Sequence, residues 1–373
     1  MKIICGQKEL LKGIQIASKA VTPKSSDPNM ECIVIDTKNN DIRLVANNME
    51  LGIETIISGE IIENNSVDRI ELTANLFQNI IKSLPDTNIT IEYDSGSKAT
   101  ISDSSDRKFE INVTSADEFP FPTKLNKSNP IEISQLALKT AIGQTSFAAS
   151  KNGNGDMMTG ESFKIVAPST LRLSALNGHR IAIRNVTLDK EYENSSIIIP
   201  AKSMDDIASI LSTDDDKKVS VYIGANSAMF EFDDTTIISR LIEGKYFNVE
   251  QMLSDDYETH IIVDKQSIAS CIQRTKLVVS DSEKRPVILN VTDGNVLITM
   301  NGSKGKFEEN LEIEKNGKDI EIGFNPDYLI STFNAITDEK VDMYFINSKA
   351  PCFIKDANEV YIYLILPINI NVN

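Results

Sequence analysis

The feature that most constrains the fold is an internal repeat, because one amphipathic helix pattern occurs three times along the chain. In residues 7–21, QKELLKGIQIASKAV, the apolar residues Leu10 and Ile14 stand four apart, which is typical of one face of a helix. The matching first positions in two later segments are Leu138 and Ile268, at successive intervals of 128 and 130 residues. Each interval is close to one third of the 373-residue chain.

Each third of the chain also contains a second helix pattern, in TANLFQNIIKSL, PAKSMDDIASIL and NPDYLISTFNAI. Its first apolar residues, Phe77, Met204 and Leu329, follow those of the first helix by 67, 66 and 61 residues. Two coincident spacings predict a threefold internal repeat. Thr73 and Asn325 are expected to be N-caps, and a proline after Asn325 suits the first turn of a helix.

The segments between these helices alternate apolar and polar residues with a period of two, which is typical of strands. A hairpin pattern follows each first helix, and the Asp293-Gly294 pair in the last copy suits a tight turn. The sequence therefore predicts an α+β fold of three repeated domains, each with two helices and antiparallel sheets. The expected domains are residues 1–126, 127–255 and 256–373, joined by short linkers.

Composition restricts the class of protein. With 41% hydrophobic and 25% charged residues, the chain is typical of globular proteins. It shows neither a signal peptide nor a spanning segment, so a cytoplasmic protein is expected. The net charge of −16 argues against binding of nucleic acid by bulk electrostatics, although a local basic surface remains possible. Four scattered cysteines predict reduced, mostly buried thiols rather than a disulfide or zinc site: Cys5, Cys32, Cys271 and Cys352.

No arrangement of residues predicts catalysis or a metal site. The two histidines, His179 and His260, fall in different repeats, and no common nucleophile, phosphate-loop or metalloprotease motif occurs. The acidic run at residues 214–218 is expected to be a solvated turn rather than a metal site. Only the second repeat has Gly-His-Arg, at residues 178–180, after its hairpin. This tripeptide is either a hydrogen-bonded turn or part of a site peculiar to that repeat.

The end of the chain is unusual, because residues 361–370, YIYLILPINI, are nearly all apolar. A core strand would account for about half of these side chains. Pro367 cannot donate a hydrogen bond to a neighbouring strand, so the last residues are expected to leave the sheet at an edge. The apolar side chains beyond that point are candidates for the wall of a groove.

These residues resemble the bacterial DNA polymerase III beta subunit, the replication sliding clamp, over the whole chain. The matching motifs, in order, are KELLKGIQ, TANLFQNIIKSLP, DEFPFP, LNGHRIAI, IIIPAK, SRLIEGKYF, GFNPDYL and the LPI ending. The resemblance implies a head-to-tail homodimer that forms a six-domain ring around duplex DNA, with helices lining the hole. It implies no cofactor, no metal and no catalytic residues. The expected setting is the bacterial cytoplasm, in association with the nucleoid.

The resemblance also implies a groove between the second and third domains, where the replicative polymerase, clamp loader and repair proteins insert short linear peptides. Such peptides include Gln-x-x-Leu-Phe motifs. Phe247, Gln251 and Asn369 depart from the residues common in the family, which leaves the preferred peptide open. The groove residues carried over are Met158, Leu176, Gly178, His179, Arg180, Ile181, Phe247, Met252, Asn325, Tyr328, Leu366, Pro367 and Ile368.

Two further sets of residues follow from the resemblance. The seam between subunits is expected at Phe109 on one side and at Val278 and Val279 on the other. The second set contains the positions expected to face DNA, which are Lys12, Lys24, Lys82, Lys151, Asn152 and Lys202. Each basic residue of this set could instead belong to a solvated face.

Two other classes of protein remain open. One is a β-rich hydrolase that uses the acidic loops, which metal-dependent turnover would reveal. The other is a structural repeat protein with no role on nucleic acid, which would not be retained on closed circular DNA.

Overall fold

The chain forms two compact units, and each is described here by itself. The computed structural model of the protein describes residues 1–63, 68–94, 96–105, 107–151, 153, 156–280 and 282–370. Unit 1 contains Met1–Leu136 and Ser209–Leu241, and unit 2 contains Ala137–Ala208 and Ile242–Asn373. No helix in the described ranges is both long and apolar enough to cross a membrane.

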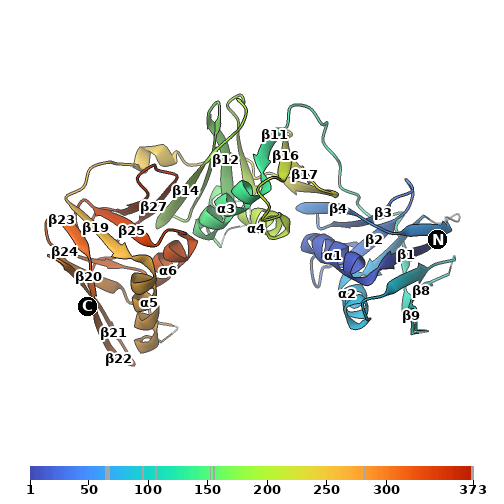
Figure 1. Cartoon of the computed structure of the whole chain (residues 1–373), viewed down its shortest axis with the longest axis horizontal. Helices are drawn as coiled ribbons and strands as arrows, with labels where there is room; N and C mark the ends of the chain where they lie inside the picture. The colour runs from blue at the N-terminus through green and yellow to red at the C-terminus, as the bar shows by residue number, and fades with distance from the viewer. Residues whose placement is uncertain are drawn as a thin grey trace. The chain divides into compact units, whose positions relative to one another are not determined.

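The two predicted helices of each repeat are present (Figure 1). Helix α1 ends at Ala17, four residues earlier than predicted, because a 3₁₀ turn over Ser18–Ala20 follows it and Val21 is extended. Val21 therefore does not belong to the apolar face of the helix. The helices are α1 (Gln7–Ala17), α2 (Ala74–Ser83), α3 (Gln135–Thr145), α4 (Ala201–Ile210), α5 (Lys265–Thr275) and α6 (Pro326–Ala335).

The predicted caps differ in how they work. The side chain of Asn325 accepts a hydrogen bond of 2.9 Å from the backbone N–H of Asp327, as predicted for α6. Thr73 does occupy the N-cap position of α2, but its side chain makes no capping hydrogen bond. The N-cap of α5 is Asp264, which accepts a 2.7 Å bond from the N–H of Ser267.

Unit 1 contains two antiparallel sheets, and α1 packs on β3 and β4 of the larger one. Pairing of β4 with β18 joins strands of the first and second repeats into one continuous sheet. The smaller sheet has the order β5 (Glu60–Glu63), β1 (Lys2–Gly6), β7 (Asn88–Glu92), β8 (Lys98–Asp103), β9 (Lys108–Asn112). The larger has the order β10 (Thr114–Ser115), β6 (Arg69–Thr73), β2 (Cys32–Asp36), β3 (Ile42–Asn47), β4 (Leu51–Ile57), β18 (Thr235–Arg240), β17 (Ser227–Phe232), β16 (Lys218–Ile223), β11 (Ile131–Ser134).

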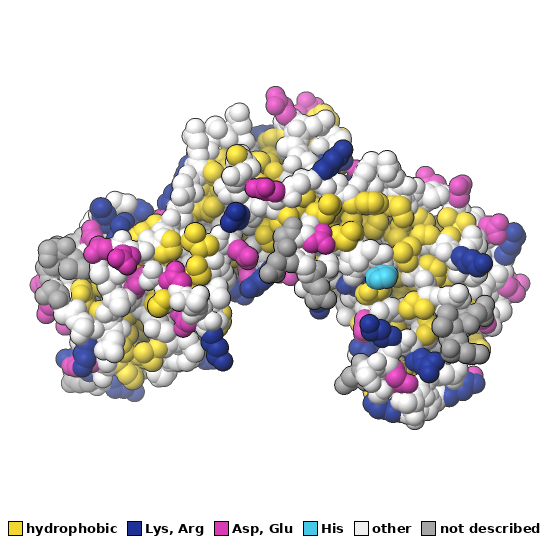
Figure 2. Space-filling view, turned by 180° about the vertical axis from the view of Figure 1, so that it is seen from behind, with side chains coloured by type: hydrophobic (Ala, Val, Ile, Leu, Met, Phe, Trp, Pro, Cys, Tyr) yellow, Lys and Arg dark blue, Asp and Glu magenta, His cyan; other side chains and the backbone are white. Residues whose placement is uncertain are grey.

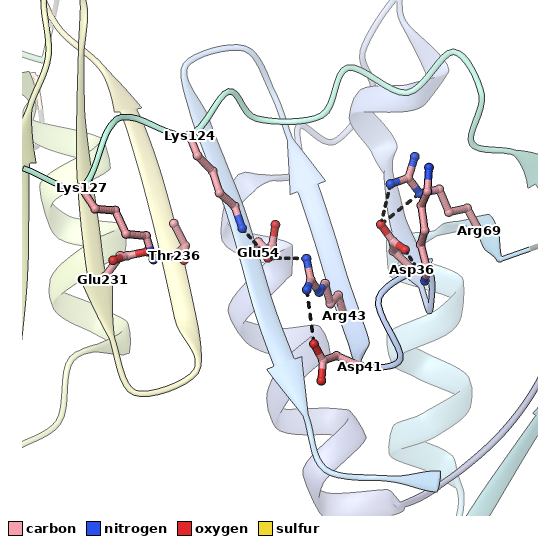
Figure 3. A network of polar contacts seen from close by, with 10 residues as sticks. Asp36, Asp41, Arg43, Glu54, Arg69, Lys124, Lys127, Glu231 and Thr236 are labelled. Atoms are coloured by element: carbon pink, nitrogen blue, oxygen red, sulfur yellow. Dashed lines mark hydrogen bonds and ion pairs between the residues drawn. The ribbon is translucent and has the colours of Figure 1, made fainter. Parts of the chain in front are cut away.

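A segment after β10 ties the two repeats of unit 1 together across the joint between β4 and β18 (Figure 3). Lys124 reaches Glu54 on β4 at 2.8 Å, and Lys127 reaches Glu231 on β17 at 2.7 Å. Leu125, between the two lysines, packs against a small buried cluster on the second-repeat strands. The segment therefore holds both sides of the joint by charged and apolar contacts.

Unit 2 also contains two antiparallel sheets (Figure 1). Pairing of β14 with β27 joins strands of the second and third repeats. The larger sheet has the order β15 (Ser196–Pro200), β12 (Gly160–Ala167), β13 (Thr170–Leu176), β14 (Arg180–Thr187), β27 (Tyr361–Ile365), β26 (Cys352–Lys355), β25 (Lys340–Phe345), β19 (Thr259–Asp264), β23 (Glu314–Gly317). The smaller has the order β22 (Gly305–Glu312), β21 (Asn295–Gly302), β20 (Val287–Thr292), β24 (Ile320–Phe324).

The four cysteines are free thiols, as the sequence predicted. Three are buried and Cys32 is half-buried. Burial raises the pKa of the Cys5 and Cys271 thiols to about 12, which disfavours the thiolate form. These thiols therefore behave as core side chains rather than as nucleophiles.

Candidate functional site

A cavity of about 520 Å³ lies in unit 2 beside the segment that follows β27. It is open to solvent on one side and has both apolar and polar walls. It brings together six residues that the sequence predicted for a groove: His179, Asn325, Tyr328, Leu366, Pro367 and Ile368.

The end of the chain forms one wall of this cavity. All five residues of β27 are buried, which is half of residues 361–370, as predicted, and β27 is a central strand with partners on both sides. The expectation that the chain leaves the sheet at an edge was therefore wrong. It leaves at the end of a central strand, where Leu366 N–H still donates to the carbonyl of His179 at 2.9 Å.

Beyond Pro367 the chain contacts β24 through an antiparallel bridge between Ile368 and Gly323. Ile368 N–H donates to the Gly323 carbonyl at 2.8 Å. A Cβ at Gly323 would lie 2.5 Å from a methyl carbon of Ile370, so only glycine lets the chain end approach β24 this closely. These contacts hold Leu366 and Pro367 in place as a wall.

The Gly-His-Arg tripeptide forms the turn between β13 and β14. The side-chain oxygen of Asn177 accepts hydrogen bonds of 3.2 Å from the N–H groups of His179 and Arg180. Gly178 has φ +80°, a conformation that favours glycine, and a Cβ there would meet open space. The glycine is required for the turn rather than for close backbone approach. His179 is exposed, and its ring stacks on Tyr328 with 6.1 Å between ring centres.

Arg180 was predicted as a groove residue, but it does not line the cavity and its side chain points into unit 2. Only 8% of the surface area of Arg180 is exposed. The guanidinium donates to Ser331 Oγ at 2.5 Å and to the carbonyl of Phe147, and it lies 4.7 Å from the Tyr328 ring centre. Arg180 thereby supports Tyr328, the wall on which His179 stacks.

A group of packed apolar side chains adjoins the cavity, and Leu366 belongs to both the apolar group and the cavity wall. Phe247 and Met252 stand out from the surface, with 43% and 38% of their areas exposed. On the face of unit 2 seen in Figure 2, hydrophobic side chains form a broad exposed area. The predicted residues in the packed part of the group are Met158, Leu176, Ile181 and Leu366.

Sequence reasoning missed the opposite wall of the cavity, which follows α5. Glu283 fixes this wall, because its Oε2 accepts hydrogen bonds from the backbone and hydroxyl groups of Ser280 and Ser303, at 2.8–3.2 Å. These bonds lower the pKa of Glu283 to about 2. No local pattern signals this contact, because Ser303 lies on a separate hairpin. Val279, which was predicted for the seam, also lies on this wall. The wall residues that no prediction named are Lys276, Ser280, Glu283, Lys284, Arg285 and Met300.

The residues expected at a subunit seam have different settings. Phe109 is half-buried on β9, an edge strand of its sheet in the described residues. Val278 and Val279 are also half-buried and pack against the core of unit 2. The seam prediction treats both side chains as free for a partner subunit, whereas this packing leaves only part of each available. Val279 lines the cavity as well. Their neighbour Leu277 is 74% exposed.

The lysines expected to face DNA are all exposed. Lys12, Lys82 and Lys202 lie on α1, α2 and α4, while Lys24 and Lys151 lie in loops. Asn152 lies outside the described residues. Exposure suits either a DNA-facing or a solvated role, so these assignments stay predictions.

Residues 214–218, three aspartates followed by two lysines, are exposed, as expected, and the turn ends where Lys218 begins β16. Within the described ranges, no group of three or more His, Cys, Asp or Glu side chains is arranged to hold a metal ion. His260 Nε2 lies 2.7 Å from Asp342, and its ring stacks on Tyr344 at 4.4 Å. His179 and His260 thus make separate local contacts.

Three sequence profiles of the DNA polymerase III beta subunit match the chain in order. The N-terminal domain matches residues 1–124, the central domain 132–248 and the C-terminal domain 250–369. A relative, the beta sliding clamp of Streptococcus pneumoniae, is 27% identical, with 97% of each chain covered.

Solved structures agree with these matches. A crystal structure from Eubacterium rectale, assigned as a DNA polymerase III beta subunit, is 44% identical with a TM-score of 0.93, and all of both chains is covered. The DNA polymerase sliding clamp of Bacillus subtilis is 26% identical, with a TM-score of 0.90 and 99% of each chain covered.

Proposed function

Because this chain belongs to the family of DNA polymerase III beta subunits, the sliding clamps, we propose that two copies form a closed ring around duplex DNA. The ring tethers the replicative polymerase to its template and has no catalytic activity of its own. The observation that carries the proposal is the full-length likeness at 44% identity. We assign the domains to residues 1–126, 127–255 and 256–373, and the site of action to the bacterial cytoplasm at the nucleoid.

Encirclement fits the acidic composition. A protein that holds DNA by surface charge would need an excess of cations, whereas this chain has a net charge of −16. A closed ring needs little affinity, because topology prevents it from leaving. The exposed lysines on α1, α2 and α4 would then supply weak contacts with the phosphate backbone.

The edges of the sheets support a head-to-tail contact. In the described residues β9 is an edge strand in unit 1 and β22 is an edge strand in unit 2. A strand edge offers backbone groups to a partner strand. Because each copy carries both edges, pairing of β9 with β22 of a second copy can repeat and close into a ring.

The cavity and its adjoining apolar group support a peptide groove. Leu366 and Pro367 offer aliphatic walls, and Tyr328 with His179 offers an aromatic one. We propose that the polymerase, clamp loader and repair proteins insert short linear peptides there. A single peptide should bind with micromolar strength, since one or two buried apolar anchors contribute roughly 1.5–3 kcal/mol each.

The proposed function is tested by retention on DNA of different topology. After loading by a clamp loader, the protein should remain on nicked circular DNA and slide off the same DNA once it is made linear. Equal retention on both forms would contradict encirclement. Metal-dependent hydrolysis of the DNA would favour the hydrolase alternative.

Leu277→Asp should give a folded monomer. Leu277 is the most exposed of the large apolar residues around the proposed seam, and the change places an unpaired charge in a dry contact. Leu277 does not line the cavity, so this variant is more selective than Val279→Asp. Light scattering during gel filtration measures the mass, and peptide binding serves as the folding control. A variant that stays dimeric at micromolar concentration would show that the seam lies elsewhere.

Changing Lys12, Lys82 and Lys202 together to Glu should weaken loading and release the ring from nicked circular DNA at lower salt. Each lost phosphate contact weakens binding without regard to sequence. Dimerisation and peptide binding should persist. The matched control changes three exposed lysines outside the helices, Lys38, Lys190 and Lys349, to Glu. If both triple variants behave alike across a salt series, the assignment of the helix lysines is wrong.

A further inference from the structure

The short helix η5 (Val249–Met252) carries an acidic side chain that two cations share. Glu250 Oε1 lies 3.0 Å from Lys164 Nζ and 3.2 Å from Arg172 Nη1. Arg172 also donates to the side-chain oxygen of Asn185 at 2.9 Å, which fixes its guanidinium. Glu250 is therefore tied to two strands, β12 and β13.

The two cations are direct neighbours in the sheet. Lys164 and Arg172 face each other in the register of β12 and β13. Like charges at such a pair of positions repel. The Glu250 carboxylate lies between them and removes this repulsion, so the three side chains form one unit, here called the ion triad.

The same segment forms part of the apolar end of the groove. Val249 and Leu253 pack in one cluster with Leu176 and Leu366. Met252 is the last residue of η5 and is 38% exposed beside that cluster. Any shift of η5 would therefore move side chains on which the peptide is expected to rest.

The ion triad borders a cavity and is therefore partly open to solvent. The cavity has a volume of about 600 Å³ and is lined by the triad, by Ile165 and Val166 of β12, and by residues 194–196, where β15 begins. Burial opposes ionisation of Glu250, but hydrogen bonds and charge from Lys164 and Arg172 outweigh it and lower its pKa. The carboxylate is therefore charged at neutral pH.

We propose that Glu250 is a positioning residue for the peptide groove: through the ion triad it holds η5 on β12 and β13, and so sets the shape of the groove's apolar end. This inference rests on the proposed function, because it requires that peptides bind at this groove. An isolated exposed ion pair would matter little. Glu250 differs from such an isolated pair, because its loss leaves Lys164 and Arg172 facing each other with no carboxylate between them.

The test measures affinity for a Gln-x-x-Leu-Phe peptide by calorimetry with the full-length protein. Glu250→Gln should weaken peptide binding by about three- to tenfold, because it releases η5 from the two cations while the side chain at position 250 keeps its size. Lys164→Gln should weaken binding less, because Arg172 still holds the carboxylate. The double variant that combines Glu250→Gln with Lys164→Gln should bind the peptide better than Glu250→Gln, because it also removes the repulsion between Lys164 and Arg172. Glu243→Gln, an exposed glutamate before η5, is the matched control and should bind like the wild type.

The outcomes separate the inference from the function. Two results would overturn the positioning role while leaving the groove in place. One is wild-type affinity in Glu250→Gln, and the other is a double variant that binds the peptide more weakly than either single variant. If the wild-type protein itself binds no peptide, the proposed groove fails and the inference fails with it. Lys164→Gln keeps the test decisive should Glu250→Gln not fold.

Discussion

Leu366→Lys is expected to weaken binding of a Gln-x-x-Leu-Phe peptide at least tenfold, about 1.4 kcal/mol. Leu366 is the residue shared by the cavity and the adjoining apolar group, so it lies where an apolar anchor would enter. Lysine would replace an aliphatic wall with a charge that must lose water when the peptide binds. The backbone bond from residue 366 to the His179 carbonyl does not depend on the side chain and should persist.

Calorimetry on the purified dimer measures this effect. Leu297→Lys provides the matched control, because Leu297 is a partly exposed leucine on β21 that does not line the cavity. Deleting residues 366–373 should abolish binding, but it also removes the bridge to Gly323 and so is less selective. Unchanged affinity in Leu366→Lys would mean that the groove lies elsewhere.

The second large effect concerns a carboxyl group buried in unit 2. Glu161 on β12 is fully buried, and its Oε1 contacts the hydroxyl of Thr145 on α3. That hydroxyl also lies 2.7 Å from the carbonyl of Ala141, to which it donates. The Thr145 hydroxyl has only one hydrogen to donate, so a neutral Glu161 carboxyl can donate its own proton to Thr145 while that hydroxyl donates to Ala141. Burial, and to a smaller extent the charge of Asp205, raises the pKa of Glu161 to about 8.

The raised pKa gives stability a definite pH dependence. In the unfolded chain Glu161 titrates near the ordinary glutamate value, so between roughly pH 4.5 and 8 the folded state binds the extra proton. Stability therefore falls as pH rises through this window and levels off above it. At pH 7 the cost of keeping the carboxyl neutral is about 3 kcal/mol, from 1.36 kcal/mol per pKa unit.

Glu161→Gln should remove this cost, because an amide keeps a donor for Thr145 and cannot ionise. We expect the free energy of unfolding to rise by up to about 3 kcal/mol at pH 7, with a larger gain at pH ~9 and a smaller one at pH ~5.5. Urea unfolding followed by circular dichroism at the three pH values measures the difference. Glu193→Gln, at an exposed site, is the control and should show no such trend. A gain that does not grow with pH would contradict a neutral Glu161.

Local sequence patterns were enough to predict the helices, because the spacing of Leu10, Phe77 and their counterparts depends only on which face is buried. They also predicted the side-chain cap at Asn325. Patterns failed where the outcome depends on distant residues. Thr73 takes the predicted N-cap position of α2, but its side chain makes no capping hydrogen bond. Arg180 turns inward because Ser331 and Phe147, far away in the chain, accept hydrogen bonds from its guanidinium.

The candidate site was predictable in part for the same reason. Family motifs identified Leu366, Pro367 and Tyr328, which the cavity does bring together. The wall fixed by Glu283 was missed, since its contact with Ser303 joins two loops that no periodicity relates. Period-two alternation likewise identifies strands but not their partners, so pairing of β14 with β27 could not be foreseen.

The central place of β27 has a consequence for synthesis of the protein. β27 leaves the ribosome long after β14, and until it does, β14 remains an open edge that can pair with other chains. Pairs such as Arg180 with Ile365 close a very long loop, so this step is slow compared with the hairpins around it. The groove wall at Leu366 follows directly on β27. A chain must therefore be translated past Leu366 before it can present the groove, and products truncated before β27 cannot compete for the peptide partners.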